Sequence, residues 1–379
     1  MNRFGVSEEG PVRCLWVGPD LARGGGAATH LRQLLLHMQT RDLGFASFGA
    51  SVESAVDQNI TAFAALDHRH WPNYPRTIRR LARFVGRRRP RAVIAFGPQP
   101  LIVASAALRL AGVCPGLGYV EITRPSAASR LAPVSMAGRI NAALLREALS
   151  HVHIAAANSR DGVHELAEWA GVSRTHLRLV RNPIDLQIWE GDPRPYHDSP
   201  HLRLLTSGRL VPSKGFGDLI EAAAGLSERF SFTVAIAGDG PQRAALERQA
   251  AALGISDRVE FLGWIADLRS EMRQADMFVF PSHYEGFPNS VLEAMAGARP
   301  VVSSFWGTDA RILHATGVIR GYPPGDVAAL SAALAALMES TGVRASLADR
   351  GRLHVRAFAA EAVVSDYDAM FGALERIAA

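Results

Sequence analysis

The chain of 379 residues is too long for one ordinary hydrophobic core and suits two domains of about 150 residues each. Hydrophobic residues make up 48% of the sequence and charged residues 20%, a balance that excludes an intrinsically disordered protein. The formal net charge of +5 favours acidic partners such as phosphorylated substrates or anionic lipid.

Features that direct a chain into or across a membrane are not evident in the sequence. No apolar run approaches the ~20 residues of a membrane span, and the first ten residues lack the apolar core of a signal peptide. Two cysteines, Cys14 and Cys114, are too few for a disulfide framework or a cysteine-based zinc site. We therefore expect a cytoplasmic protein.

Apolar runs alternate with amphipathic helical stretches along the first half of the chain, a pattern typical of α/β proteins. A first helix is expected at 27–39. The expected strands of this half lie at 12–17, 45–48, 91–96, 117–122 and 153–157. The stretch 191–200, rich in proline, glycine and aspartate, then predicts a domain boundary.

A second α/β series follows the boundary. Its expected strands are 202–206, 233–237, 259–262, 277–280 and 300–303, and its helices are 217–228, 241–253 and 290–298. We therefore expect two tandem Rossmann-like, doubly wound domains at 1–190 and 200–355. A C-terminal helix at 356–379 is expected to pack back on the first domain.

The segment 278–302 combines a buried strand, a loop with Glu285 and a helix that starts at Asn289 or Ser290 as its N-cap. Ligands of parallel sheets bind at the carboxyl ends of strands, where helix N-termini favour phosphate. Glu293 lies about one turn inside that helix. Two carboxylates beside an anion site suit a diol plus a phosphate, as in a sugar nucleotide, whereas the alternative is that they only stabilise the helix dipole.

Of the 41 basic residues other than histidine, Lys214 is the single lysine. Gly215 follows it, which excludes a P-loop. Arg209 and Lys214 lie between a strand end and a helix, so both are able to reach phosphate oxygens in one crevice. The alternative is a pair of exposed surface cations.

The glycine run 24–26 precedes the first helix. A nicotinamide site is rejected, because Thr29 stands where GxGxxG needs its last glycine and no acidic residue ends the second strand. A turn that approaches a phosphate and an ordinary βα turn both remain open.

Several motifs together resemble retaining glycosyltransferase family 4. They are GRL and KGF within 208–216, GDGP at 238–241, FLG at 261–263, EGFPNSVLEAMA at 285–296, GVIRGYPPGD at 317–326 and VRNPID at 180–185. The similarity is good from about residue 158 to 338. In the first 150 residues it is limited to the glycine-rich loop and the strand order.

The resemblance implies a GT-B fold. It also implies an enzyme that transfers a sugar from UDP- or GDP-sugar to a hydroxyl of a lipid-linked or glycan acceptor and needs no metal and no cofactor. Arg209 and Lys214 would stabilise the leaving diphosphate, Glu293 would hold the ribose, and Glu285 would lie beside the transferred sugar. Further donor contacts are implied for Gly25, Gly26, Gly238, Gly240, Phe287, Pro288, Asn289 and Ser290.

Some positions depart from the family pattern. Pro288 stands where many members have glycine, and Ala28 replaces a glutamate that often follows the glycine pair. The segment YVEITRPS occupies the place of a histidine or a Glu-Arg pair, so Glu121 is the candidate catalytic residue there, with Arg124 as its candidate companion. Glu121 is alternatively a hinge salt-bridge residue.

An arginine-rich helix is expected from Arg76 to Arg91, with Ile78, Leu81 and Phe84 on one face. Its cationic face suits an anionic membrane surface, such as the inner face of the plasma membrane, or is an ordinary surface of an arginine-biased protein. Nucleic acid is not expected as a partner, because no aromatic side chains are interleaved with the arginines.

Two other functions remain as alternatives to a glycosyltransferase. One is a sugar-nucleotide epimerase of the same two-domain shape, which would consume donor without an acceptor. The other is a nucleotide-sugar-binding subunit with little activity of its own.

Overall fold

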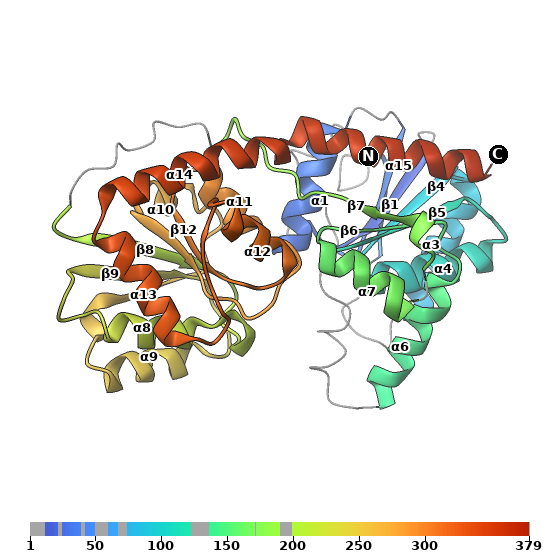
Figure 1. Cartoon of the computed structure of the whole chain (residues 1–379). Coiled ribbons are helices and arrows are strands. Elements are labelled where there is room, and N and C mark those ends of the chain that lie inside the picture. Colours follow the sequence, from blue (N-terminus) through green and yellow to red (C-terminus); the bar gives the residue numbers. More distant parts are fainter. Residues whose placement is uncertain are drawn as a thin grey trace. The chain divides into compact units, whose positions relative to one another are not determined.

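The computed structural model describes residues 12–21, 25–38, 42–49, 60–66, 74–122, 136–170, 172–189 and 199–378. The chain forms two compact α/β units (Figure 1). The first unit consists of Met1–Pro183 together with Ala360–Ala379, and the second unit is Ile184–Ala359.

The chain leaves the first unit between residues 183 and 184 and returns to it between residues 359 and 360. Ile184 forms an isolated parallel bridge with Ala359, and its N–H donates to the carbonyl of Phe358 at 2.9 Å. The divisions therefore differ from the boundaries expected at 190, 200 and 356. Backbone pairing with the end of the second unit draws the residues from Ile184 onward into that unit, ahead of the proline-rich stretch.

Within the described residues, the first unit contains a seven-stranded sheet in the order β3-β2-β1-β4-β5-β6-β7. All of its strand pairs are parallel. The strands are β1 (Cys14–Gly18), β2 (Leu43–Ser47), β3 (Ile60–Ala65), β4 (Ala92–Phe96), β5 (Gly116–Glu121), β6 (Ile154–Ala157) and β7 (Leu177–Leu179). Continuous burial of β1, β2, β4, β5 and β6 explains why these strands read as unbroken apolar runs.

Helices cover both faces of this sheet (Figure 1). One layer consists of α3 (Tyr74–Arg88), α4 (Pro98–Ala111), α6 (Met136–Leu149) and α7 (Arg160–Ala170), and the other of α1 (Gly26–His37) and α15 (Ala360–Ala378). The C-terminal helix α15 packs directly on β5. A Cβ added to Gly116 would lie 2.1 Å from the carbonyl oxygen of Leu374, so only glycine permits this approach.

The second unit contains a six-stranded parallel sheet in the order β10-β9-β8-β11-β12-β13. Its strands are β8 (Leu202–Ser207), β9 (Phe232–Ala237), β10 (Val259–Gly263), β11 (Met277–Phe280), β12 (Val301–Ser304) and β13 (Arg320–Tyr322). One face carries α8 (Phe216–Ala224), α9 (Arg243–Ala252) and α13 (Val327–Met338), and the other α10 (Arg269–Gln274), α11 (Asn289–Ala296) and α12 (Thr308–Ala315). The helix α14 (Thr341–Val355) packs with both sets of helices. Its Leu347 joins the hydrophobic cluster formed with α8, α9 and α13, and its Val355 joins the cluster formed with α10, α11 and α12.

Three strands that the sequence did not predict are β3, β7 and β13, and each lies at the edge of its sheet. In β7 the side chains of Arg178 and Leu179 are exposed, and in β13 Arg320 is exposed. Because exposed residues interrupt the short patterns of β7 and β13, these two strands lack the apolar run that identifies a central strand.

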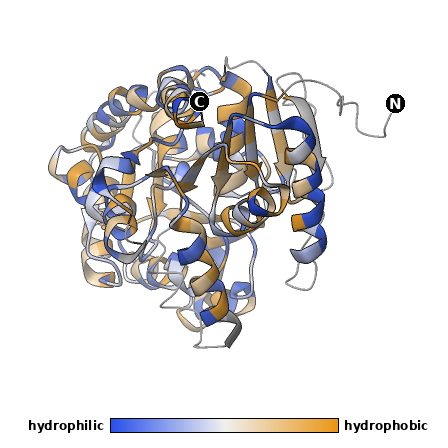
Figure 2. Cartoon of the chain, turned by 90° about the vertical axis from the view of Figure 1, so that its right-hand side faces the viewer, coloured by the Kyte–Doolittle hydropathy of each residue, from blue (hydrophilic) through white to orange (hydrophobic). Residues whose placement is uncertain are grey.

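The strands of the first unit are largely hydrophobic in Figure 2, and hydrophilic residues gather on the outer sides of its helices. Among the described helices, none is by itself long and apolar enough to cross a membrane. The pair Val327–Met338 and Thr341–Phe358 meets that test by length and composition, but it is bent by 102°.

Candidate active site

The strand order of the second unit reverses between β8 and β11, since the chain runs from β8 outward to β9 and then returns to β11 on the other side. At such a switch point the loops that leave the carboxyl ends of the two strands diverge and open a crevice for ligand. The loops in question are residues 208–215 after β8 and 281–288 after β11.

The loop after β8 approaches the loop after β11 through its backbone. Gly215 has φ +65°, and a Cβ there would lie 2.2 Å from the carbonyl oxygen of Pro281. The Ser213 carbonyl accepts a hydrogen bond from the N–H of His283 at 2.8 Å and lies 3.1 Å from the Ser282 hydroxyl, whose single proton it shares with the Glu285 carboxylate. The glycine of the KGF motif therefore serves a close contact between the two loops.

This contact brings Lys214 and Glu285 together. The Lys214 ammonium forms an ion pair with the Glu285 carboxylate, which also accepts a hydrogen bond from Ser282 at 3.1 Å. Their side chains are 25% and 22% exposed, so a ligand can reach both. The Lys214 Nζ also lies 5.9 Å from the centre of the Phe280 ring.

Arg209 lies in the same loop as Lys214 and is exposed. Within the described part of the chain, its guanidinium forms no hydrogen bond or ion pair. The two cations thus differ: Lys214 is held by a carboxylate, whereas Arg209 is available to an anion from solvent.

A second polar pair beside the site was not predicted from the sequence. His283 Nε2 lies 2.7 Å from a carboxylate oxygen of Asp218, in the first turn of α8. Burial, and then the Asp218 carboxylate, raise the pKa of the Tyr322 hydroxyl at the end of β13. The signal in the sequence was a histidine two residues before Glu285, but its partner lies 65 residues away and only the fold brings it near.

Helix α11 begins at Asn289, as the sequence predicted, but its N-cap lies one residue earlier. Pro288 is the N-cap, with φ −77° and ψ 127°, and no side chain caps the helix, so the prediction of Asn289 or Ser290 as N-cap was wrong. Proline suits this extended position because its φ is already restricted. Asn289 and Ser290 begin the helix, and no acidic residue occupies its first turn. The dipole and N–H groups of this turn favour an anion.

Glu293 lies on α11 beyond its first turn and is partly buried. Phe287 is 9% exposed and packs on Trp306 and Phe358, with ring centres 6.1 and 5.2 Å apart. Of the two predicted carboxylates, Glu285 is the one that lies beside a cation. Phe287 contributes mainly to the packing under the loop.

The glycines of GDGP allow two loops of the second unit to cross at close range. A Cβ on Gly238, with φ +154°, would lie 1.8 Å from the carbonyl oxygen of Gly208, and one on Gly240 would lie 2.5 Å from that of Leu210. Both glycines thus place the backbone after β9 against the loop that carries Arg209.

Gly25 and Gly26 open α1 in the first unit. Gly25 is the N-cap with φ +124°, and a Cβ added to either glycine would meet no described atom within 4 Å. No side chain caps this helix, and its first turn carries no acidic residue. A helix start without an acidic residue or a side-chain cap favours an anion through its N–H groups.

Glu121 ends β5 in the first unit and is 1% exposed. It accepts a hydrogen bond from the Tyr119 hydroxyl. Burial and the nearby carboxylate raise the pKa of Tyr119 well above its usual value. Arg124, its suggested companion, lies outside the described residues. No group of three or more His, Cys, Asp or Glu side chains suited to a metal ion occurs in the described ranges.

Comparison with known proteins gives two family matches. Residues 24–188 match the family described as Glycosyltransferase Family 4, and residues 201–340 match Glycosyl transferases group 1. The lipopolysaccharide core biosynthesis glycosyltransferase LpsE of Rhizobium meliloti is 33% identical over 165 residues, 43% of this chain and 48% of the relative. Glycogen synthase of Mycobacterium tuberculosis is 35% identical over 210 residues, 54% of this chain and 48% of the relative. The chain thus matches about half the length of these relatives.

Among solved structures, HepE of Anabaena in complex with UDP has a TM-score of 0.79 at 18% identity, over 96% of this chain and 100% of that chain. At this identity the likeness concerns the fold, which is the pair of parallel-sheet units called GT-B. The two family matches lie next to each other in the sequence, and both agree with the GT-B fold of the structure. The chain therefore has the GT-B fold and contains a Glycosyltransferase Family 4 domain at residues 24–188 and a Glycosyl transferases group 1 domain at residues 201–340.

Proposed function

We propose that this chain transfers a sugar from a UDP- or GDP-sugar to a hydroxyl of a lipid-linked or glycan acceptor, with retention of anomeric configuration, in the synthesis of lipopolysaccharide or another polysaccharide. The observation that carries the proposal is the Lys214–Glu285 pair at the strand switch point of the second unit. The names of the relatives support it, since LpsE is a lipopolysaccharide core glycosyltransferase and HepE was crystallised with UDP.

The diphosphate of the donor is proposed to bind between the loop after β8 and the start of α11. Departure of the nucleotide leaves additional negative charge on the diphosphate, and cations already in position stabilise that charge without reorganisation. Arg209 is exposed and Lys214 is partly exposed, so both are accessible to phosphate oxygens. Together with the N–H groups of Asn289 and Ser290, they supply the positive charge that a metal ion provides in other transferases.

The remaining donor contacts follow the loops of the second unit. Glu285 is proposed to contact the transferred sugar, and Glu293 the ribose hydroxyls, because a carboxylate accepts hydrogen bonds from a diol. Phe287 and Pro288 are proposed to shape the pocket around the sugar. The backbone at Gly238 and Gly240 is proposed to lie near the nucleobase. From the first unit, Gly25 and Gly26 are proposed to approach a phosphate, and Glu121 to act on the acceptor side.

Calorimetric titration with UDP and with GDP, both in the presence of EDTA, tests this site. Lys214→Ala is expected to weaken binding of the preferred nucleotide about tenfold or more, since a charge-assisted hydrogen bond is lost. Glu293→Ala is expected to weaken it as well. Arg229→Ala and Glu339→Ala are matched controls, because these exposed residues pair with each other away from the switch point.

Two outcomes would contradict the assignment: binding of neither nucleotide, or variants that bind as well as the wild type. Incubation with UDP-N-acetylglucosamine alone separates transfer from epimerisation, because only an epimerase converts the donor without releasing nucleotide.

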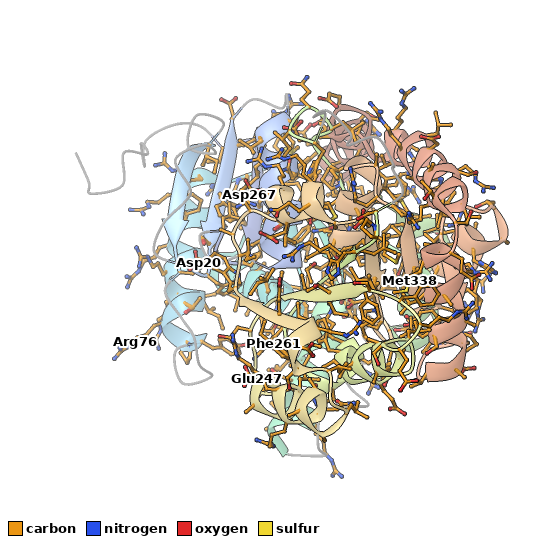
Figure 3. All side chains as sticks on the ribbon, turned by 90° about the vertical axis from the view of Figure 1, so that its left-hand side faces the viewer. Asp20, Arg76, Glu247, Phe261, Asp267 and Met338 are labelled. Carbon is orange, nitrogen blue, oxygen red and sulfur yellow. The ribbon has the colours of Figure 1, made fainter. Side chains whose placement is uncertain are left out.

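A location at the cytoplasmic face of the plasma membrane is also proposed, through α3. Its arginines at 76, 79, 80, 83 and 87 are exposed, and Arg76 points away from the ribbon in Figure 3. Its apolar side chains, such as Leu81 and Phe84, are buried in the first unit. Attraction to anionic lipid is therefore electrostatic and involves no insertion of an apolar face.

A further inference from the structure

Trp306 follows β12 and lies beneath the loop that carries Glu285. Its side chain is 1% exposed, and the indole Nε1–H donates a hydrogen bond to the carbonyl oxygen of Gly286 at 3.0 Å. No other hydrogen bond to this carbonyl is formed within the described residues. Trp306 therefore holds the peptide that immediately follows Glu285.

The indole ring also fills the space under this turn. Its centre lies 5.7 Å from that of Phe280, at the end of β11, and 6.1 Å from that of Phe287, both in edge-to-face geometry. Phe287 in turn packs on Phe358, with ring centres 5.2 Å apart. Such aromatic contacts are directional, so the position of the indole determines where the turn can lie.

The start of the same loop is held separately. Ser304, at the end of β12, donates a hydrogen bond to the carbonyl of Ser282, and Ser282 donates to Glu285. Glu285 thus lies between two points anchored to the β12 side, at Ser282 and Gly286. The loop that carries Lys214 and Arg209 contacts the Glu285 loop at Ser213, but it also has an anchor of its own after β9, where the Leu210 N–H donates to the Asp239 carbonyl at 3.0 Å.

We infer that Trp306 is a positioning residue for Glu285, and that through Gly286 it sets the sugar subsite of the donor rather than the nucleotide subsite. The inference rests on the proposed function. Without the indole N–H, the buried Gly286 carbonyl has no partner, and the turn must shift to find one. That shift moves Glu285, while the backbone that carries Arg209 and Lys214 stays bonded after β9 through Leu210.

The test compares Trp306→Phe with the wild type in two titrations. The first uses UDP and GDP, and the second uses the sugar nucleotide that the wild type binds most tightly among UDP-glucose, UDP-galactose, UDP-N-acetylglucosamine and GDP-mannose. Affinity for the nucleotide diphosphate is expected to stay within about twofold. The additional affinity contributed by the sugar is expected to fall about tenfold, the effect of one buried hydrogen bond.

Trp16→Phe is the matched control. Trp16 is fully buried in the first unit, and its indole N–H has no partner among the described residues, so the same substitution removes ring volume but no hydrogen bond. It is expected to leave both affinities unchanged. If Trp306→Phe does not fold, 3-benzothienylalanine at position 306 replaces the N–H by sulfur in a ring of the same shape and makes the same comparison.

The outcomes separate the two proposals. A wild type that binds neither nucleotide overturns the proposed function and this inference with it. A wild type that binds, with a Trp306 variant that loses nucleotide and sugar affinity equally or loses neither, overturns the inference alone.

Discussion

The ion pair between Lys214 and Glu285 places a carboxylate next to the cation that is proposed to meet a diphosphate. A diphosphate that contacts Lys214 competes with Glu285 for the ammonium and is repelled by the carboxylate. Both side chains retain about a quarter of their exposure, so solvent screens the interaction and keeps its free energy small.

Glu285→Gln is therefore expected to bind the preferred nucleotide diphosphate about two- to fivefold more tightly than the wild type, a change of at most about 1 kcal/mol. Sugar transfer by this variant is expected to fall, because Glu285 is proposed to contact the sugar. Calorimetric titration beside Lys214→Ala measures the opposite signs of the two effects. Weaker nucleotide binding by Glu285→Gln would count against competition for Lys214, and Glu339→Gln controls for loss of a surface carboxylate.

Helices α1 and α15 are joined in the first unit by His30. This residue is 1% exposed, and its Nε2 lies 2.9 Å from the Tyr367 hydroxyl of α15. Burial lowers the pKa of His30 to about 3. The helix that begins at Gly25 and Gly26 is thus packed against the C-terminal helix through a histidine that stays neutral in the folded state.

The free energy of unfolding is expected to depend on pH through His30. The unfolded chain binds a proton near pH 6.5, and the folded chain does so only near pH 3. The contribution of neutral His30 to the free energy of unfolding is therefore present above pH 6.5. It decreases as the pH falls below that value, by about 2 kcal/mol at pH 5. In denaturant unfolding at pH 7.5 and pH 5, His30→Gln should lose less stability than the wild type by this amount.

His164→Gln is the control for that comparison, because His164 is 59% exposed and pairs with Glu168 on its own helix. Its loss of stability between the two pH values should equal that of the wild type within about 0.5 kcal/mol. An equal loss in His30→Gln and the wild type would show that His30 is not the group that titrates.

Each unit of the whole molecule has its own hydrophobic clusters on both faces of its own sheet. The proposed donor contacts lie mainly in the second unit, and the basic helix α3 lies in the first. Substitutions in the proposed membrane surface are therefore expected to leave the proposed nucleotide site unchanged.

Wild-type protein is expected to co-sediment with phosphatidylglycerol vesicles at low salt and to be released at high salt, since exposed charges are screened. Gln substitutions at Arg79, Arg80, Arg83 and Arg87 should abolish this binding, at about 1 kcal/mol for each charge removed. Nucleotide binding by the variant should equal that of the wild type. The matched control neutralises exposed arginines of the second unit at 248, 273, 311 and 352.

Co-sedimentation that is equal in the α3 variant and the wild type, or absent from the wild type, would contradict a role of α3 at anionic lipid. A loss that is equal in the α3 variant and the control would indicate net charge rather than this helix.

The sequence by itself determined the two α/β units and the loops that are proposed to bind the donor. Central strands such as β4 and β11 are buried on both faces, so their apolar runs are continuous and visible. Arg209, Lys214 and Glu285 lie in the loops that follow such strands, and topology brings the carboxyl ends of parallel strands to one edge. The edge strands β7 and β13 escaped prediction because exposed residues interrupt their short patterns.

Only the tertiary structure decided which of these residues are in contact. The pairs Lys214–Glu285 and His283–Asp218 span 71 and 65 residues, and Trp306 reaches Gly286 across 20. No local pattern encodes such contacts, because they depend on where whole strands and helices pack. Backbone geometry likewise decided that Pro288 is the cap of α11. Pairing between distant segments decided the first boundary at Pro183, and amino-acid composition contains no information on such pairing.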